Sequence, residues 1–181
     1  MARLPAIDPA AASGKTKELL NEVKKRFGMV PNLTRTFANS DAALEGFLAF
    51  SGALSKGRLT PALREQIAIA AAEANSCEYC LSAHTAIGKM LGLGAEELAG
   101  SRRALSSDPK VEAALQFAHE IVVRRGELDV ADLEKVRGAG YGDGEIAEII
   151  ANVALNIFTN YFNHIAQTEV DFPLVRTEVA A

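Results

Sequence analysis

Helix caps and helix terminators recur along the whole chain, and no segment shows sustained strand alternation. Between them, apolar residues repeat at intervals of three and four, the spacing of one buried helix face. Thr60-Pro61 and Asp108-Pro109 each place a capping side chain directly before a proline, which is typical of a helix N-terminus. Gly28 follows a helical stretch as a left-handed terminator. This punctuation predicts an all-α fold, a bundle of seven to eight helices.

The helical segments show no linker between them, so we expect one domain over residues 1–181. It has an extended N-terminal segment at 1–12, and Phe172-Pro173 closes the ordered chain ahead of a tail at 172–181. One expected helix is capped by Asn75 or Ser76 and ends near Leu91, before Gly92. The other expected segments lie at about 13–27, from 32, and at 42–56, 61–74, 95–100, 110–125, 129–136 and 143–167.

Composition limits the partners that such a domain can take. The chain is 49% apolar and 23% charged, with a net charge of -4, so it can bury a core and has little attraction for nucleic acid or an anionic membrane. Its opening lacks a secretory pattern, and the longest apolar stretch, at 146–162, is interrupted by Glu148 and three asparagines. We therefore expect a cytoplasmic protein with no membrane span.

Cys77 and Cys80 are the two cysteines of the chain. A structural disulfide does not persist in a reducing compartment, so a close pair indicates a catalytic, redox-sensing or metal-binding role. With His84 they stand at offsets 0, 3 and 7, along one face of a helix. Helical residues three apart lie about 5 Å apart at Cα, within the range that a disulfide bridges. The pair could close and reopen with little backbone movement.

A thiol needs help to react at neutral pH. An ordinary cysteine has a pKa of about 8.5, and half-ionising it at pH 7 takes about 2 kcal/mol. A helix N-terminus supplies roughly 0.3 to 1 kcal/mol at an exposed site, so a base is also needed. His84 is the candidate base, and Glu65 on the preceding helix could orient it. Cys77 lies nearer the helix start and Cys80 nearer His84, so either could be the reactive thiol.

Glu65, Cys77, Cys80 and His84 together fill the pattern E-x11-C-x2-C-x3-H. The pattern resembles the active-site signature of the alkylhydroperoxidase D-like proteins in the carboxymuconolactone decarboxylase superfamily. The resemblance continues through the segments RLPAID, VPNLTRTFANS and HTAIGKMLGL, so it covers most of the chain. It is nearest to the branch of peroxidase-related proteins.

The resemblance implies a helical fold, oligomers that are trimers or hexamers, and thiol-dependent reduction of organic hydroperoxides with no cofactor or metal. It makes Cys80 the peroxidatic thiol, Cys77 the proton donor and resolving thiol, and Glu65 with His84 the proton relay. A dithiol or a lipoylated protein would reduce the oxidised pair. The chain departs from the best-understood member at Tyr79, where that member has a histidine before its second cysteine.

The same residues are compatible with two other functions. The chain could be a decarboxylase-type enzyme acting on a lactone or small acid, or a non-enzymatic helical oligomer with a redox-sensing or zinc-binding cysteine pair. His119 is interpreted as a structural histidine and His164 is given no catalytic role. A polar seam on the last helix is interpreted first as a subunit interface, with a wet face or an active-site wall as alternatives. It consists of Glu145, Glu148, Asn152, Asn156, Thr159 or Asn160, and Asn163.

Overall fold

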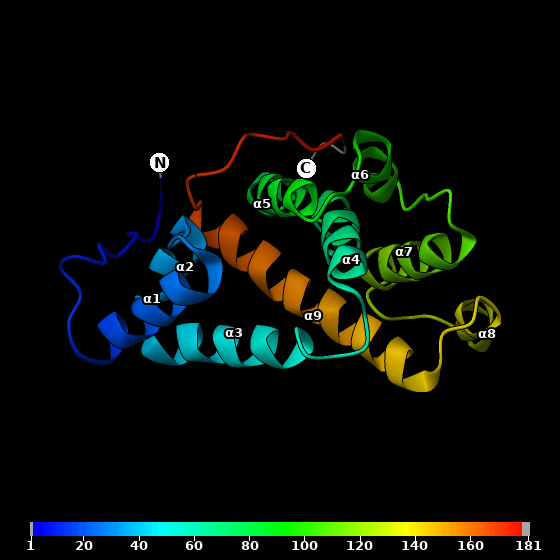
Figure 1. The fold of residues 1–181 in the computed structure, drawn as a ribbon, viewed down its shortest axis with the longest axis horizontal. Helices are drawn as coiled ribbons and strands as arrows, with labels where there is room; N and C mark the ends of the chain where they lie inside the picture. Colours follow the sequence, from blue (N-terminus) through cyan, green and yellow to red (C-terminus); the bar gives the residue numbers. More distant parts are fainter. Residues whose placement is uncertain (1, 179–181) are drawn as a thin grey trace.

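The computed structural model describes residues 2–178, which form nine helices and no strand (Figure 1). The all-α prediction is confirmed, with one helix more than the seven to eight expected. The helices are α1 (Gly14–Phe27), α2 (Asn32–Phe37), α3 (Asp41–Leu54), α4 (Pro61–Ala74), α5 (Glu78–Met90), α6 (Ala95–Arg102), α7 (Pro109–Val123), α8 (Val130–Gly138) and α9 (Asp143–Ala166). Within the described part of the chain, no helix combines the length and apolar character needed to cross a bilayer.

α4 is the central helix, in contact with α5, α6, α7 and α9 (Figure 1). It begins as the sequence predicts, because the Thr60 hydroxyl accepts a hydrogen bond from the Leu63 N–H at 3.2 Å and Pro61 occupies the first helical position. Ile67 and Ile69 are fully buried, as are the alanines at 70–72. These small alanine side chains let the neighbouring helices pack close to the α4 backbone.

α9 runs diagonally beneath α4 and α5, from α8 to α2 (Figure 1). Its asparagines at 152, 156, 160 and 163 are all buried. Apolar side chains, including Phe158 and Ile165, are instead exposed on its other face. The prediction that the polar seam is first of all a subunit interface is therefore wrong, because α4 and α5 cover that face of the helix.

The turn between α4 and α5 determines where the cysteines lie. Ser76 has a left-handed backbone (φ 54°), and the N–H groups of Ser76 and Cys77 donate to the carbonyls of Glu73 and Ala72 at 2.9 and 2.8 Å. These paired bonds are a Schellman motif, which closes α4. An N-cap needs extended backbone, so Ser76 cannot cap α5 and the expected cap at Asn75 or Ser76 is wrong. Cys77 itself is the cap.

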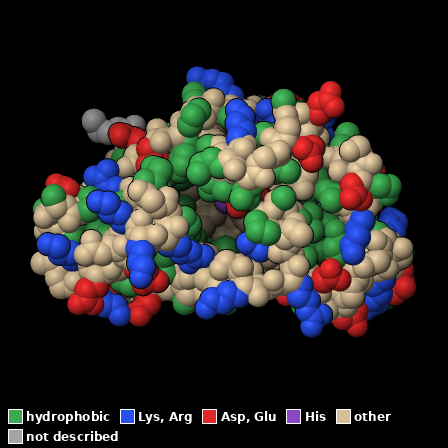
Figure 2. Space-filling model, in the orientation of Figure 1, with side chains coloured by type: hydrophobic (Ala, Val, Ile, Leu, Met, Phe, Trp, Pro, Cys, Tyr) green, Lys and Arg blue, Asp and Glu red, His purple; other side chains and the backbone are tan. Residues whose placement is uncertain are grey.

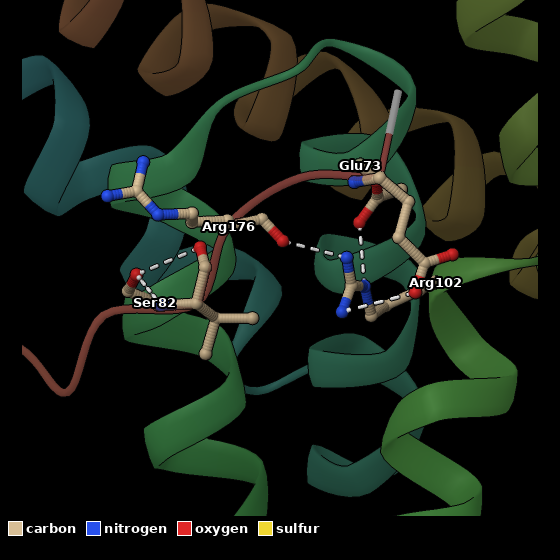
Figure 3. A network of polar contacts seen from close by, with 6 residues as sticks. Glu73, Ser82, Arg102 and Arg176 are labelled. Atoms are coloured by element: carbon tan, nitrogen blue, oxygen red, sulfur yellow. Dashed lines mark hydrogen bonds and ion pairs between the residues drawn. The ribbon is translucent and has the colours of Figure 1, made fainter. Parts of the chain in front are cut away.

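The C-terminal tail lies across α5, α4 and α6 (Figure 3). Val175 N–H donates to the Ser82 hydroxyl at 2.9 Å, and the Arg102 guanidinium bonds the Arg176 carbonyl at 2.8 Å and the Glu73 carboxylate at 2.7 Å. The last helix ends at Ala166, within one residue of the expected end, and the contacts of the tail continue past Pro173, where the ordered chain was expected to close, to Glu178. The expected tail residues 179–181, like Met1, lie outside the described chain.

Candidate active site

The four residues predicted from the sequence come together where α4 faces α5. The Glu65 carboxylate, on α4, lies 2.7 Å from the imidazole Nδ1 of His84, on α5. Cys80 is in the first turn of α5, one turn before His84, and Cys77 caps the same helix. The two sulfurs are free thiols and not a disulfide.

Cys80 is surrounded by hydrogen-bonding groups although only 2% of it is exposed. The side-chain amide of Asn163, on α9, donates from Nδ2 to the Cys80 sulfur at 3.1 Å. The Thr159 hydroxyl lies 3.9 Å from the same sulfur. The Cys80 backbone N–H donates to the Cys77 sulfur at 3.4 Å, which ties the two cysteines together. An ionised sulfur at Cys80 would thus meet a donor from a second helix.

These surroundings divide the pair into one acidic and one non-acidic thiol. Burial opposes ionisation of Cys80, but the hydrogen bond with Cys77, the charge of His84 and the amides of Asn160 and Asn163 outweigh it and lower the pKa of Cys80 to about 6. The hydrogen bond to Cys80 and burial raise the pKa of Cys77 above its ordinary value. Exposure does not distinguish the two cysteines, because Cys77 is also 2% exposed.

The charge of His84 interacts with both the Cys80 sulfur and the Glu65 carboxylate. Its burial disfavours the charged imidazolium, but the carboxylate of Glu65 outweighs that effect and raises the pKa of His84 above its ordinary value. An imidazolium held there stabilises a Cys80 thiolate and can return a proton to a leaving group.

A cavity of about 290 Å³ opens onto this site. Cys80, His84 and Glu65 line it, whereas Cys77 does not. Most of the other lining residues are apolar, among them Phe47 and Leu155. Figure 2 shows this face of the molecule hollowed near its centre, with apolar side chains around the hollow and Lys or Arg side chains beside it. Of the two sulfurs, only that of Cys80 is in the wall that a small molecule would contact.

Comparisons with known proteins agree with this arrangement. Residues 41–120 match the model of the carboxymuconolactone decarboxylase family. Two solved structures of peroxidase-related proteins superpose over most of the chain. One, from Silicibacter sp. TM1040, is 26% identical, with a TM-score of 0.81 and coverage of 92% of this chain and 89% of that one. The other, an alkylhydroperoxidase AhpD core protein from Ralstonia eutropha JMP134, is 29% identical, with a TM-score of 0.82 and coverage of 94% and 92%.

Residues 41–120 thus match the carboxymuconolactone decarboxylase family, and most of the chain is similar to alkylhydroperoxidase D-like proteins. Its similarity is to the peroxidase-related branch. The debrominase Bmp8, solved in complex with 2,3,4-tribromopyrrole, shares the fold at a TM-score of 0.81, with 18% identity and coverage of 94% of this chain and 92% of that one. A comparison with curated proteins gives no match.

At this site, the sequence interpretation gave no individual role to the α9 residues beside Cys80. Asn163 and Thr159 belong to the polar seam, and the sequence offered an active-site wall only as an alternative for it. The signal was present, since amides at three- and four-residue spacing on an otherwise apolar helix need partners wherever that face is buried. The sequence alone did not show that the polar face of α9 packs against Cys80.

Tyr79 stands where the best-understood member has histidine. Its hydroxyl forms hydrogen bonds with α2 and the tail and not with the thiols. The hydroxyl accepts from the Leu33 N–H at 3.0 Å and donates to the Asp171 carboxylate at 2.9 Å. Its ring packs edge-on against Phe172 of the tail, with ring centroids 5.9 Å apart. Tyr79 thus joins α5 to α2 and to the tail. Across residues 2–178, no group of three or more His, Cys, Asp or Glu side chains is arranged to hold a metal ion.

Proposed function

We propose that this protein is a thiol-dependent peroxidase that reduces organic hydroperoxides through Cys77 and Cys80. The observation that carries the proposal is the asymmetry of the pair. Cys80 lines the cavity and has the lowered pKa, while Cys77 lies outside the cavity wall and keeps its proton. A nucleophile and a resolving thiol need this division.

In the first step the Cys80 thiolate attacks the terminal oxygen of the hydroperoxide. The O–O bond breaks and an S–O bond forms, so Cys80 becomes a sulfenic acid and the organic part leaves as an alkoxide. The His84 imidazolium, held by Glu65, gives its proton to the alkoxide, which departs as the alcohol.

In the second step Cys77 attacks the sulfur of the Cys80 sulfenic acid. The S–S bond forms, the S–O bond breaks, and the hydroxide takes the Cys77 proton to leave as water. A dithiol then reduces the disulfide and is itself oxidised to a disulfide; a lipoylated protein is one such reductant. This cycle needs no metal or cofactor and suits a reducing compartment such as the cytoplasm.

The test is intact-mass analysis of the reduced protein after one equivalent of cumene hydroperoxide. The wild type is expected to lose two hydrogens as the disulfide forms. Cys77→Ser is expected to gain one oxygen, trapped as a sulfenic acid on Cys80. A sulfenic acid trapped on Cys77 in Cys80→Ser, with none on Cys80, would reverse the assigned roles.

The family match also includes decarboxylases, which provides a second enzymatic candidate. A lactone or small-acid decarboxylase has no need of a thiol pair. Activity toward such a substrate that survives alanine at both cysteines, together with no reaction toward hydroperoxide, would favour this alternative over the peroxidase.

We also propose that the chain forms a homo-oligomer, a trimer or hexamer, through the outer face of α9. An apolar stripe follows this face, and its large members are 42% to 68% exposed. Exposed apolar stripes of this length are typical of interaction surfaces. The stripe consists of Ile150, Phe158, Tyr161 and Ile165.

A further inference from the structure

Two arginines contribute guanidinium groups to the wall of the cavity. Arg26 Nη1 donates to the Leu48 carbonyl at 3.3 Å, and Arg64 Nη1 donates to the Leu59 carbonyl at 2.6 Å. In residues 2–178 neither arginine forms an ion pair with a carboxylate. A guanidinium has five N–H donors, so both retain donors that can bind an anion.

In the cavity wall, no carboxylate pairs with these donors. Glu65 is the one carboxylate of the wall, and its Oε2 already bonds His84. The Ser51 hydroxyl also lies in the wall, and its oxygen is buried without a hydrogen-bond partner. The Arg26 side chain extends from α1 to this part of α3, because its Nη1 bonds the Leu48 carbonyl and lies 3.4 Å from the position of a Cβ on Gly52. Hydrogen-bond donors from α1, α3 and α4 thus line a largely apolar cavity in a chain of net charge -4.

We propose that the cavity selects hydroperoxides that carry a carboxylate. Arg26, Arg64 and the Ser51 hydroxyl bind the carboxylate, the apolar wall binds the organic body, and the hydroperoxyl group meets Cys80. This inference rests on the proposed function, since it names the substrate class of the same site. The cavity volume of about 290 Å³ is near the lower end for ligand pockets, so the substrate is a compact amphipathic anion.

A matched pair of probes isolates the carboxylate. Cumene hydroperoxide bearing a para-carboxylate is compared with the methyl ester of the same compound, using dithiothreitol as reductant. Because hydrogen bonds to charged groups are the strong ones, we expect kcat/KM for the acid to exceed that for the ester by about tenfold or more. High salt and Arg26→Gln/Arg64→Gln should each bring the ratio toward one. Arg125→Gln, which changes an exposed arginine outside the cavity wall, should keep it.

A binding measurement makes the inference independent of turnover. Calorimetric titration of the reduced protein with 4-isopropylbenzoate and with its methyl ester uses no peroxide, and the acid should bind about tenfold more tightly. Equal affinities in the wild type, or a preference for the acid that persists in the double arginine variant, would overturn the inference. A protein that binds the acid selectively but reduces neither hydroperoxide would refute the proposed function and leave the carboxylate site standing.

Discussion

The side-chain amide of Asn163 donates a hydrogen bond to the Cys80 sulfur at 3.1 Å, although the two residues are 83 positions apart in the chain. Both residues are buried, so the contact is shielded from water. A buried donor stabilises an ionised sulfur more than a protonated one. α9 is therefore part of the device that makes Cys80 acidic, together with Cys77 and His84.

Replacing that amide should make Cys80 a weaker acid. A hydrogen bond to a charged group is worth about 1.5 to 3 kcal/mol, or roughly one to two pKa units. Asn163→Leu should therefore raise the pKa of Cys80 by about that amount, measured by ultraviolet thiolate absorbance against pH. Asn152→Leu is the matched control, because the amide of Asn152 donates to the Glu148 backbone carbonyl. A folded Asn163→Leu protein with an unchanged Cys80 midpoint would exclude this role.

Glu65→Gln should lower the pKa of His84, since the carboxylate is what keeps it raised. The raised pKa of His84 also stabilises the folded state. This stabilisation is complete below the pKa of histidine in the unfolded chain, about 6.5, and is lost as the pH rises through the pKa of His84 in the folded state. The variant should lack this pH dependence. Proton NMR of the His84 ring gives the pKa, with His84→Asn to assign the signal. An unshifted His84 in Glu65→Gln would contradict the account.

Tyr79→Phe should destabilise the fold. It removes a hydroxyl that bonds both the Leu33 N–H and the Asp171 carboxylate at a residue only 4% exposed. Losing two hydrogen bonds worth about 0.5 to 1.5 kcal/mol each costs about 1 to 3 kcal/mol, measured as the free energy of unfolding in urea. Tyr161→Phe is the control, because it removes the same hydroxyl and keeps the aromatic ring in the outer stripe of α9, so it should change little. Equal stabilities of the two variants would mean that the tail contact contributes nothing.

Ile165→Glu should dissociate the oligomer. Ile165 is 68% exposed in the outer stripe of α9, and a charge there opposes burial against a second copy. Analytical ultracentrifugation should find a smaller species than for the wild type. Met90→Glu, at a residue 85% exposed on α5, should leave the assembly unchanged. A wild-type protein that sediments as a monomer would refute the oligomer proposal.

Much of this fold could be predicted from local chemistry. The Thr60-Pro61 start of α4 and the Gly28 end of α1, where φ is 76°, follow from single residues whose preferences the rest of the structure does not oppose. The start of α5 could not be predicted in the same way. Ser76 takes a left-handed backbone that closes α4, and this conformation transfers the cap to Cys77.

The contacts of the candidate site also fall into those that nearby residues predict and those that they do not. Glu65 and His84 could be paired from the spacing of their helices, because both belong to one helix–turn–helix unit. Asn163 and the tail residue Asp171 reach α5 from distant parts of the chain. Their contacts depend on how α9 is rotated and where the tail lies, and a single sequence specifies neither.

The account as a whole depends on Cys80 reacting as a thiolate at neutral pH. The most direct measurement is the rate at which cumene hydroperoxide oxidises the reduced protein, followed in a single turnover as a function of pH. With the pKa of Cys80 lowered to about 6, the rate should rise through that pH, level off near neutrality and vanish in Cys80→Ser. A rate that climbs only near the ordinary thiol value of about 8.5, or one that survives Cys80→Ser, would contradict the account.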